Sequence, residues 1–86
     1  MSSIKNLKKD INYVLGDVIE YAIDVTALKN EPNKGEEIID EAINTFDSLI
    51  ASINAKNVEN KKAHFRAINE NLETKARELV NKINSI

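Results

Sequence analysis

The chain has 86 residues, of which 42% are hydrophobic and 30% charged, and its 12 basic and 14 acidic side chains leave a net charge of −2. Two glycines and one proline are too few for a protein of many turns, and the lack of cysteine excludes a disulfide framework and a cysteine nucleophile. The longest segment without a charged residue, Ser48 to Ala55, is far too short to span a membrane. We therefore expect one all-helical domain over residues 1–86, located in the cytoplasm because no apolar signal segment precedes Lys5.

The first predicted helix covers residues 3–29 and carries a regular heptad repeat. Its apolar residues alternate between spacings of three and four, which puts them on one face of a helix. These residues are Ile4, Leu7, Ile11, Val14, Val18, Tyr21, Val25 and Leu28. Pro32 biases Glu31 away from helical geometry, so the sequence predicts that the helix ends near Lys29.

The second predicted helix covers residues 34–54. Asn33, followed three residues later by Glu36, is typical of a capping box at a helix start. The heptad spacing continues through this segment, and two further isoleucines, Ile43 and Ile50, widen the apolar stripe as in a helix packed in a bundle. The stripe itself consists of Ile39, Ala42, Phe46, Leu49 and Ile53.

The third predicted helix covers residues 58–85 and starts between Asn57 and Asn60. Its apolar stripe is Phe65, Ile68, Leu72, Ala76, Leu79, Ile83 and Ile86. Because short connections make consecutive helices antiparallel neighbours, we predict an all-α, up-down-up antiparallel three-helix bundle. We expect its core to contain Leu7, Ile11, Val14, Val18, Tyr21, Ala42, Phe46, Leu49, Phe65, Ile68, Leu72 and Leu79.

Charge is distributed unevenly along the chain, with a net charge of −5 over residues 30–54 and of +3 over residues 55–86. In the predicted topology, the first and third helices start at the same end of the bundle. That basic end would contain six candidate contact residues: Lys5, Lys8, Lys9, Lys61, Lys62 and Arg66. Lys56 would lie at the same end, and His64 would lie nearby. It is a candidate surface for an anionic partner such as RNA, a ribonucleoprotein or an acidic protein. A solvated charged face is the alternative, and net acidity with no aromatic residues among the cations argues against nucleic acid.

The first helix has more apolar surface than one stripe needs. Leu15, Ile19 and Ile23 lie progressively further round the helix from the heptad face, and Gly16 on the outer side would let another helix approach closely. These four residues are our candidate self-association surface, for a homodimer with a two-fold contact. The alternative is that the bundle itself buries a wide arc of this helix, leaving one or two isoleucines exposed.

We find no combination of residues that indicates an enzyme, and we predict no catalytic, cofactor-binding or metal-binding residue. There is no glycine-rich phosphate loop, and the single histidine, His64, is interpreted as a surface residue. Asp10, Asp17 and Asp24 recur every seven residues, about 10 Å apart, which is too far for one metal ion. We expect these carboxylates to form salt bridges with a neighbouring helix.

The segments Leu7–Tyr13 and Phe65–Ile86 resemble a group of short all-helical proteins of unassigned function from Bacteroidetes. That resemblance implies a small helical bundle and brings no activity, ligand or catalytic residue to assign to this chain. The sequence therefore favours a non-enzymatic structural or protein-interaction module that works through helix faces, with itself or another protein as partner. The alternative is a binder of an anionic partner through the basic end. Partner binding that depends steeply on salt would favour the alternative.

Overall fold

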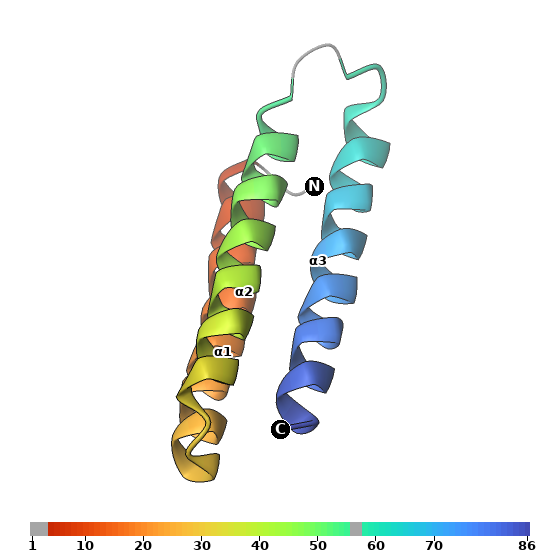
Figure 1. Ribbon diagram of the computed structural model, residues 1–86. Coiled ribbons are helices and arrows are strands. Elements are labelled where there is room, and N and C mark those ends of the chain that lie inside the picture. The colour runs from red at the N-terminus through yellow and green to blue at the C-terminus, as the bar shows by residue number, and fades with distance from the viewer. Residues whose placement is uncertain (1–3, 56–57) are drawn as a thin grey trace.

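The computed structural model describes residues 4–55 and 58–86, and its helices are α1 (Ile4–Lys29), α2 (Pro32–Ile53) and α3 (Lys61–Asn84). Every pair of these helices is in contact, and the chain runs down, up and down again along the bundle (Figure 1). The predicted up-down-up three-helix bundle is confirmed. It is a rod with extents of 47 × 19 × 18 Å. Ser3, where we expected the first helix to start, and Lys56 lie outside the described residues.

One hydrophobic core runs along the axis of the bundle. Eight of the predicted core residues are buried there: Leu7, Ile11, Val18, Ala42, Leu49, Ile68, Leu72 and Leu79. The prediction was wrong for four others. Val14, Phe46 and Phe65 are half-buried against the core, and Tyr21 is 39% exposed, with its hydroxyl donating to the Asn84 side-chain oxygen of α3.

The buried face of α1 differs from the predicted heptad face. The buried residues of this helix are Leu7, Ile11, Leu15, Val18, Ala22 and Thr26, whereas Leu28 at the end of the heptad row is 87% exposed. An α-helix has 3.6 residues per turn, so a row of residues seven apart drifts by about 20° per heptad unless the helix supercoils. Over the length of α1 this rotation carries the heptad row out of the core and brings Ala22 and Thr26 into it.

The turn between α1 and α2 closes α1 with a left-handed residue. Asn30 has φ 56°, the Glu31 N–H donates to the Thr26 carbonyl at 2.8 Å, and the Asn30 N–H donates to the Ala27 carbonyl at 3.3 Å. These two bonds form a Schellman motif, which satisfies carbonyls that the helix end would leave unpaired. The predicted end of α1 at Lys29 is therefore confirmed, and Asn30 provides the stop one residue before the Glu31–Pro32 pair.

The start of α2 corrects two predictions. The helix begins at Pro32, and its N-cap, Glu31, makes no side-chain capping hydrogen bond, so the expected Asn33–Glu36 capping box does not form. Proline suits a first helical position, because its φ is already helical and the N–H it lacks would have no partner there. Of the two isoleucines near this end, Ile38 is buried at 5% exposure, whereas Ile39, which we placed in the stripe, is half-buried.

The helix α3 begins at Lys61, three residues later than the predicted start at residue 58. Asn60 is its N-cap, and the Asn60 side-chain oxygen accepts a 3.1 Å hydrogen bond from the Ala63 N–H. The expected apolar stripe of this helix is confirmed: Ile68, Leu72, Leu79 and Ile83 are buried, while Phe65, Ala76 and Ile86 pack against the core.

Candidate functional site

An apolar groove runs between α1 and α2 on the side of the pair away from α3. Its central hollow has a volume of about 210 Å³. The residues that line this hollow, which we call the α1/α2 groove, are Asn12, Leu15, Gly16 and Ile19 of α1 with Ala42, Ile43 and Phe46 of α2. Three of the four residues predicted for self-association, Leu15, Gly16 and Ile19, therefore line one groove.

The four predicted residues take different positions relative to this groove. Leu15 is only 2% exposed and forms its floor, so our expectation that Leu15 lies on the contact surface was wrong. Ile19 is half-buried against the core. Gly16 is exposed, and a Cβ built there would meet no atom within 4 Å. Ile23 is 50% exposed and lines the continuation of the groove.

The α2 side of the groove was missed by reasoning from the sequence. Ile43 is 48% exposed, although the sequence pattern assigned it to a widened core stripe, and Phe46 is half-buried beside it. Towards the α1–α2 turn, a second hollow of about 300 Å³ continues the surface between Ile23 and Ile39. The spacing of residues along one helix predicts which of them share a side of that helix. The groove is formed by residues of two helices, and the sequence does not predict how the two helices are rotated against each other.

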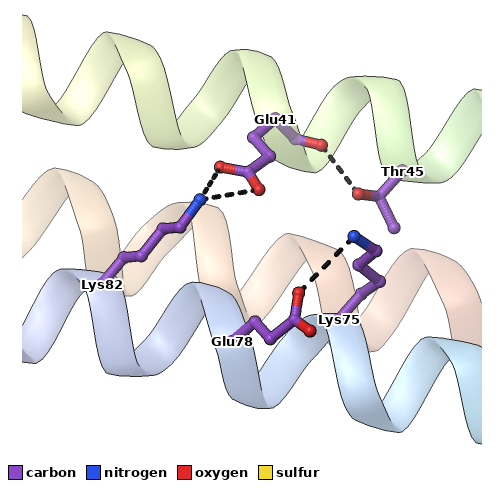
Figure 2. A network of polar contacts seen from close by, with 5 residues as sticks. All are labelled: Glu41, Thr45, Lys75, Glu78 and Lys82. Carbon is purple, nitrogen blue, oxygen red and sulfur yellow. Dashed lines mark hydrogen bonds and ion pairs between the residues drawn. The ribbon is translucent and has the colours of Figure 1, made fainter.

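The groove between α2 and α3 is polar, in contrast to the α1/α2 groove. Lys82 of α3 donates hydrogen bonds across it from Nζ to the two carboxylate oxygens of Glu41, at 2.9 and 2.7 Å (Figure 2). The Thr45 hydroxyl donates to the Glu41 carbonyl at 2.8 Å, and Lys75 lies 3.5 Å from Glu78 on α3. The hydrogen bond and the charge of Glu41 raise the pKa of Lys82 above 10.5. Glu41, Thr45 and Lys75 on this side therefore have polar partners within the molecule.

The predicted basic end divides between two sides of α1. Lys5 and Lys9 precede Asn12 and Gly16 by seven residues, or two helical turns, so they lie on the groove side of α1. Arg66 precedes Asn84 by 18 residues, or five turns, and so lies on the side of α3 that faces α1. Lys5 and Lys9 therefore lie on a different side of the bundle from Arg66, although all three lie near the same end.

These cations are free of ion pairs in the part of the chain that the structure describes. The described ion pairs are those of Lys75 with Glu78 and of Lys82 with Glu41. The ammonium of Lys9 lies 5.8 Å from the centroid of the Tyr13 ring on the same helix, within the range of a cation–π contact. In the described part of the chain, no carboxylate is therefore in ion-pair contact with these six cations.

The remaining chemically distinctive residues have structural positions. His64 Nε2 donates to the Ser52 carbonyl at 2.6 Å, joining the last turn of α2 to the first turn of α3. This half-buried position corrects our interpretation of His64 as a surface residue. Asp10, Asp17 and Asp24 are exposed and form none of the described ion pairs. Our prediction that they form salt bridges with a neighbouring helix is therefore wrong. No three potential metal ligands gather among residues 4–55 and 58–86.

None of the described helices combines the length and the apolar content that crossing a membrane requires. Comparisons with protein-family models, with curated proteins and with solved structures found no match. The resemblance to short helical proteins from Bacteroidetes therefore stays a prediction.

Proposed function

We propose that this chain is a non-enzymatic protein-interaction module that acts through a helix face, and that its partner is a second copy of the same chain bound across the α1/α2 groove. The observation that supports this proposal best is the position of two isoleucines, Ile23 of α1 and Ile43 of α2. Both are about half exposed beside a groove that is lined mainly by apolar side chains. Covering an apolar surface that spans two helices with a binding partner is favourable, because it removes apolar side chains from water.

The shape of the groove favours a helix as its occupant. Gly16 leaves open space where any other residue would place a Cβ, so a neighbouring helix could approach α1 closely at this level. The bundle is 47 Å long and 18 Å across, so one face spans about 850 Å², close to the roughly 800 Å² that each partner gives to a standard interface. A dimer of standard size would therefore use nearly the whole of this face.

A second copy suits this face better than an unrelated apolar partner because the face carries opposite charges at its two ends. Lys5 and Lys9 flank one end of the groove, and Glu36 lines the other. Such a face can be complementary to itself, which a two-fold contact between identical chains requires. The cytoplasmic location expected from the sequence stays a prediction.

Sedimentation equilibrium tests the proposal directly. We expect a dimer at micromolar concentration, and we expect the double variant Ile23→Glu, Ile43→Glu to be a monomer with unchanged helix content by circular dichroism. Leu28→Glu is the matched control: Leu28 is 87% exposed but follows Tyr21 by seven residues, which puts it on the α3 side of α1. Leu28→Glu should remain a dimer. A wild-type chain that stays monomeric at hundreds of micromolar would contradict the proposal.

A second candidate function is the binding of an anionic partner through the basic end. Its support is the lack of ion pairs for the six cations there within the described residues. We expect the triple variant Lys8→Glu, Lys61→Glu, Lys62→Glu to keep its helix content and to lose retention on heparin, a polyanion. Unchanged retention in a folded triple variant, or a wild-type chain that heparin does not retain even at low salt, would eliminate this candidate.

A further inference from the structure

The charges along the α1/α2 groove change sign from one end to the other. On α1, Lys9, Gly16 and Ile23 are spaced by seven residues and share one side of the helix. On α2, Glu36, Ile43 and Ile50 are spaced in the same way. The groove side of the molecule therefore begins with a lysine at one end, continues through an apolar centre and finishes with a glutamate at the other end.

The two charges lie at matching distances from the centre of the groove. Gly16 and Ile43 line the same hollow and so lie at the same level of the bundle. Lys9 precedes Gly16 by seven residues, and Glu36 precedes Ile43 by seven residues, which is about 10 Å along each helix. Because α1 and α2 are antiparallel, these two displacements point in opposite directions from the centre (Figure 1).

We propose that two copies pair antiparallel across their α1/α2 grooves, with the basic end of each copy against the acidic end of the other. This inference rests on the proposed self-association. A two-fold axis across the bundle at the level of Gly16 brings Lys9 of one copy to the level of Glu36 of the other, at both ends at once. A two-fold axis along the bundle would keep Lys9 of both copies at one level and Glu36 of both copies at another, so that ends of like charge would meet, which is unfavourable.

The charged groups that this pairing uses are available in the single chain. Lys5, Lys9 and Glu36 take part in none of the described ion pairs, so no existing pair has to break. Lys34, a cation near the acidic end, precedes Glu41 by seven residues and so lies on the α3 side of α2, away from the groove. Lys34 therefore adds no positive charge to the acidic end of the groove side.

Cross-linking through introduced cysteines distinguishes the two orientations, because the natural chain contains no cysteine. Lys5 and Ala27 lie eleven residues before and after Gly16 on α1, and Ala27 lines the groove near its acidic end. We expect a mixture of the Lys5→Cys and Ala27→Cys chains to give mainly hetero-linked dimers with a short thiol-to-thiol reagent. Leu28→Cys, exposed on the α3 side, is the control and should link to neither. Each variant linked mainly to itself would show a parallel pair and overturn the inference.

The sign of the salt dependence gives an independent measurement. Between 0.01 M and 1 M salt the Debye length shrinks from about 30 Å to about 3 Å, so attraction between the ends is screened. We expect the dissociation constant of the wild-type dimer to rise severalfold over this range, whereas a parallel dimer would tighten as repulsion is screened. A chain without any dimer would overturn the proposed function. A dimer that tightens with salt would overturn only the antiparallel pairing.

Discussion

Gly35 of α2 lies directly against Thr26 of α1, so closely that a Cβ built on Gly35 would stand 2.7 Å from Thr26 Oγ1. Both residues are buried, and the Thr26 hydroxyl donates to the Ala22 carbonyl at 2.6 Å, which holds it in place. The missing side chain at Gly35 is thus what lets α2 fold back against α1 immediately after the turn.

Gly35→Ala should destabilise the protein, because the added methyl group would overlap Thr26. Overpacking of this kind typically costs about 1–3 kcal/mol, which a urea denaturation midpoint would report. The same substitution in a Thr26→Ala background should cost less, since the hydroxyl and methyl groups that it meets are then gone. An equal cost in both backgrounds would mean that the contact with Thr26 does not limit this position.

Gly16→Ala should have the opposite effect. A Cβ at Gly16 meets no atom within 4 Å, so the substitution removes the intrinsic cost of glycine in a helix interior without adding strain. We expect a gain of about 0.5–1 kcal/mol in the free energy of unfolding, measured at concentrations where the chain is monomeric. A loss of stability would contradict the open surroundings of this residue.

Neighbouring isoleucines test the register of α2. Ile38 is 5% exposed in the core, whereas Ile39 is half-buried at the edge of the groove. Ile38→Ala should lower the free energy of unfolding by about 2–5 kcal/mol, and Ile39→Ala by clearly less. Because the two substitutions remove the same atoms and change helix propensity equally, their difference reports burial alone. A larger loss of stability for Ile39→Ala than for Ile38→Ala would instead support the register of α2 predicted from the heptad pattern.

Asn30 should tolerate glycine and reject a β-branched residue. Its φ of 56° lies in the left-handed region, which glycine enters freely and valine enters at a cost. We expect Asn30→Gly to be neutral or slightly stabilising and Asn30→Val to destabilise by about 1–2 kcal/mol in thermal or urea unfolding. If both variants were equally stable, the Schellman turn would not be limited by backbone conformation.

The Lys82–Glu41 pair should contribute to stability in a defined range of pH. The hydrogen bond that Lys82 donates to Glu41 raises the pKa of Lys82 above 10.5. The folded chain therefore holds the ammonium proton of Lys82 more tightly than the unfolded chain does. The contribution is therefore complete below pH 10.5 and is lost as pH rises through the folded-state pKa.

Glu41→Gln removes the partner and tests this dependence. We expect it to lower the urea midpoint modestly at neutral pH, by less than any core truncation, because exposed ion pairs are weak. The difference from wild type should shrink in strongly alkaline solution. Asp10→Asn, which removes an exposed carboxylate that forms none of the described ion pairs, is the control with no such dependence. A difference that grew with pH would contradict the direction of the shift.

Sequence patterns were sufficient for the features that depend on local geometry. The break between α1 and α2 follows from Pro32, although the start of α2 was predicted two residues too late. The core stripe of α3 follows from its spacing, because Ile68, Leu72, Leu79 and Ile83 keep close to the 3.6-residue period of a straight helix. For these features, tertiary packing agrees with what each segment prefers by itself.

Only the tertiary structure decided which side of α1 is buried. Its heptad residues and the neighbouring row through Leu15 and Ala22 are both plausible core faces, and a straight helix moves from one to the other along its length. The same holds for the candidate site, since Ile23 and Ile43 line neighbouring hollows between α1 and α2 only when these helices pack at one particular rotation. A repeat in one helix determines which residues share a side, but the side that faces the core depends on where the other two helices lie.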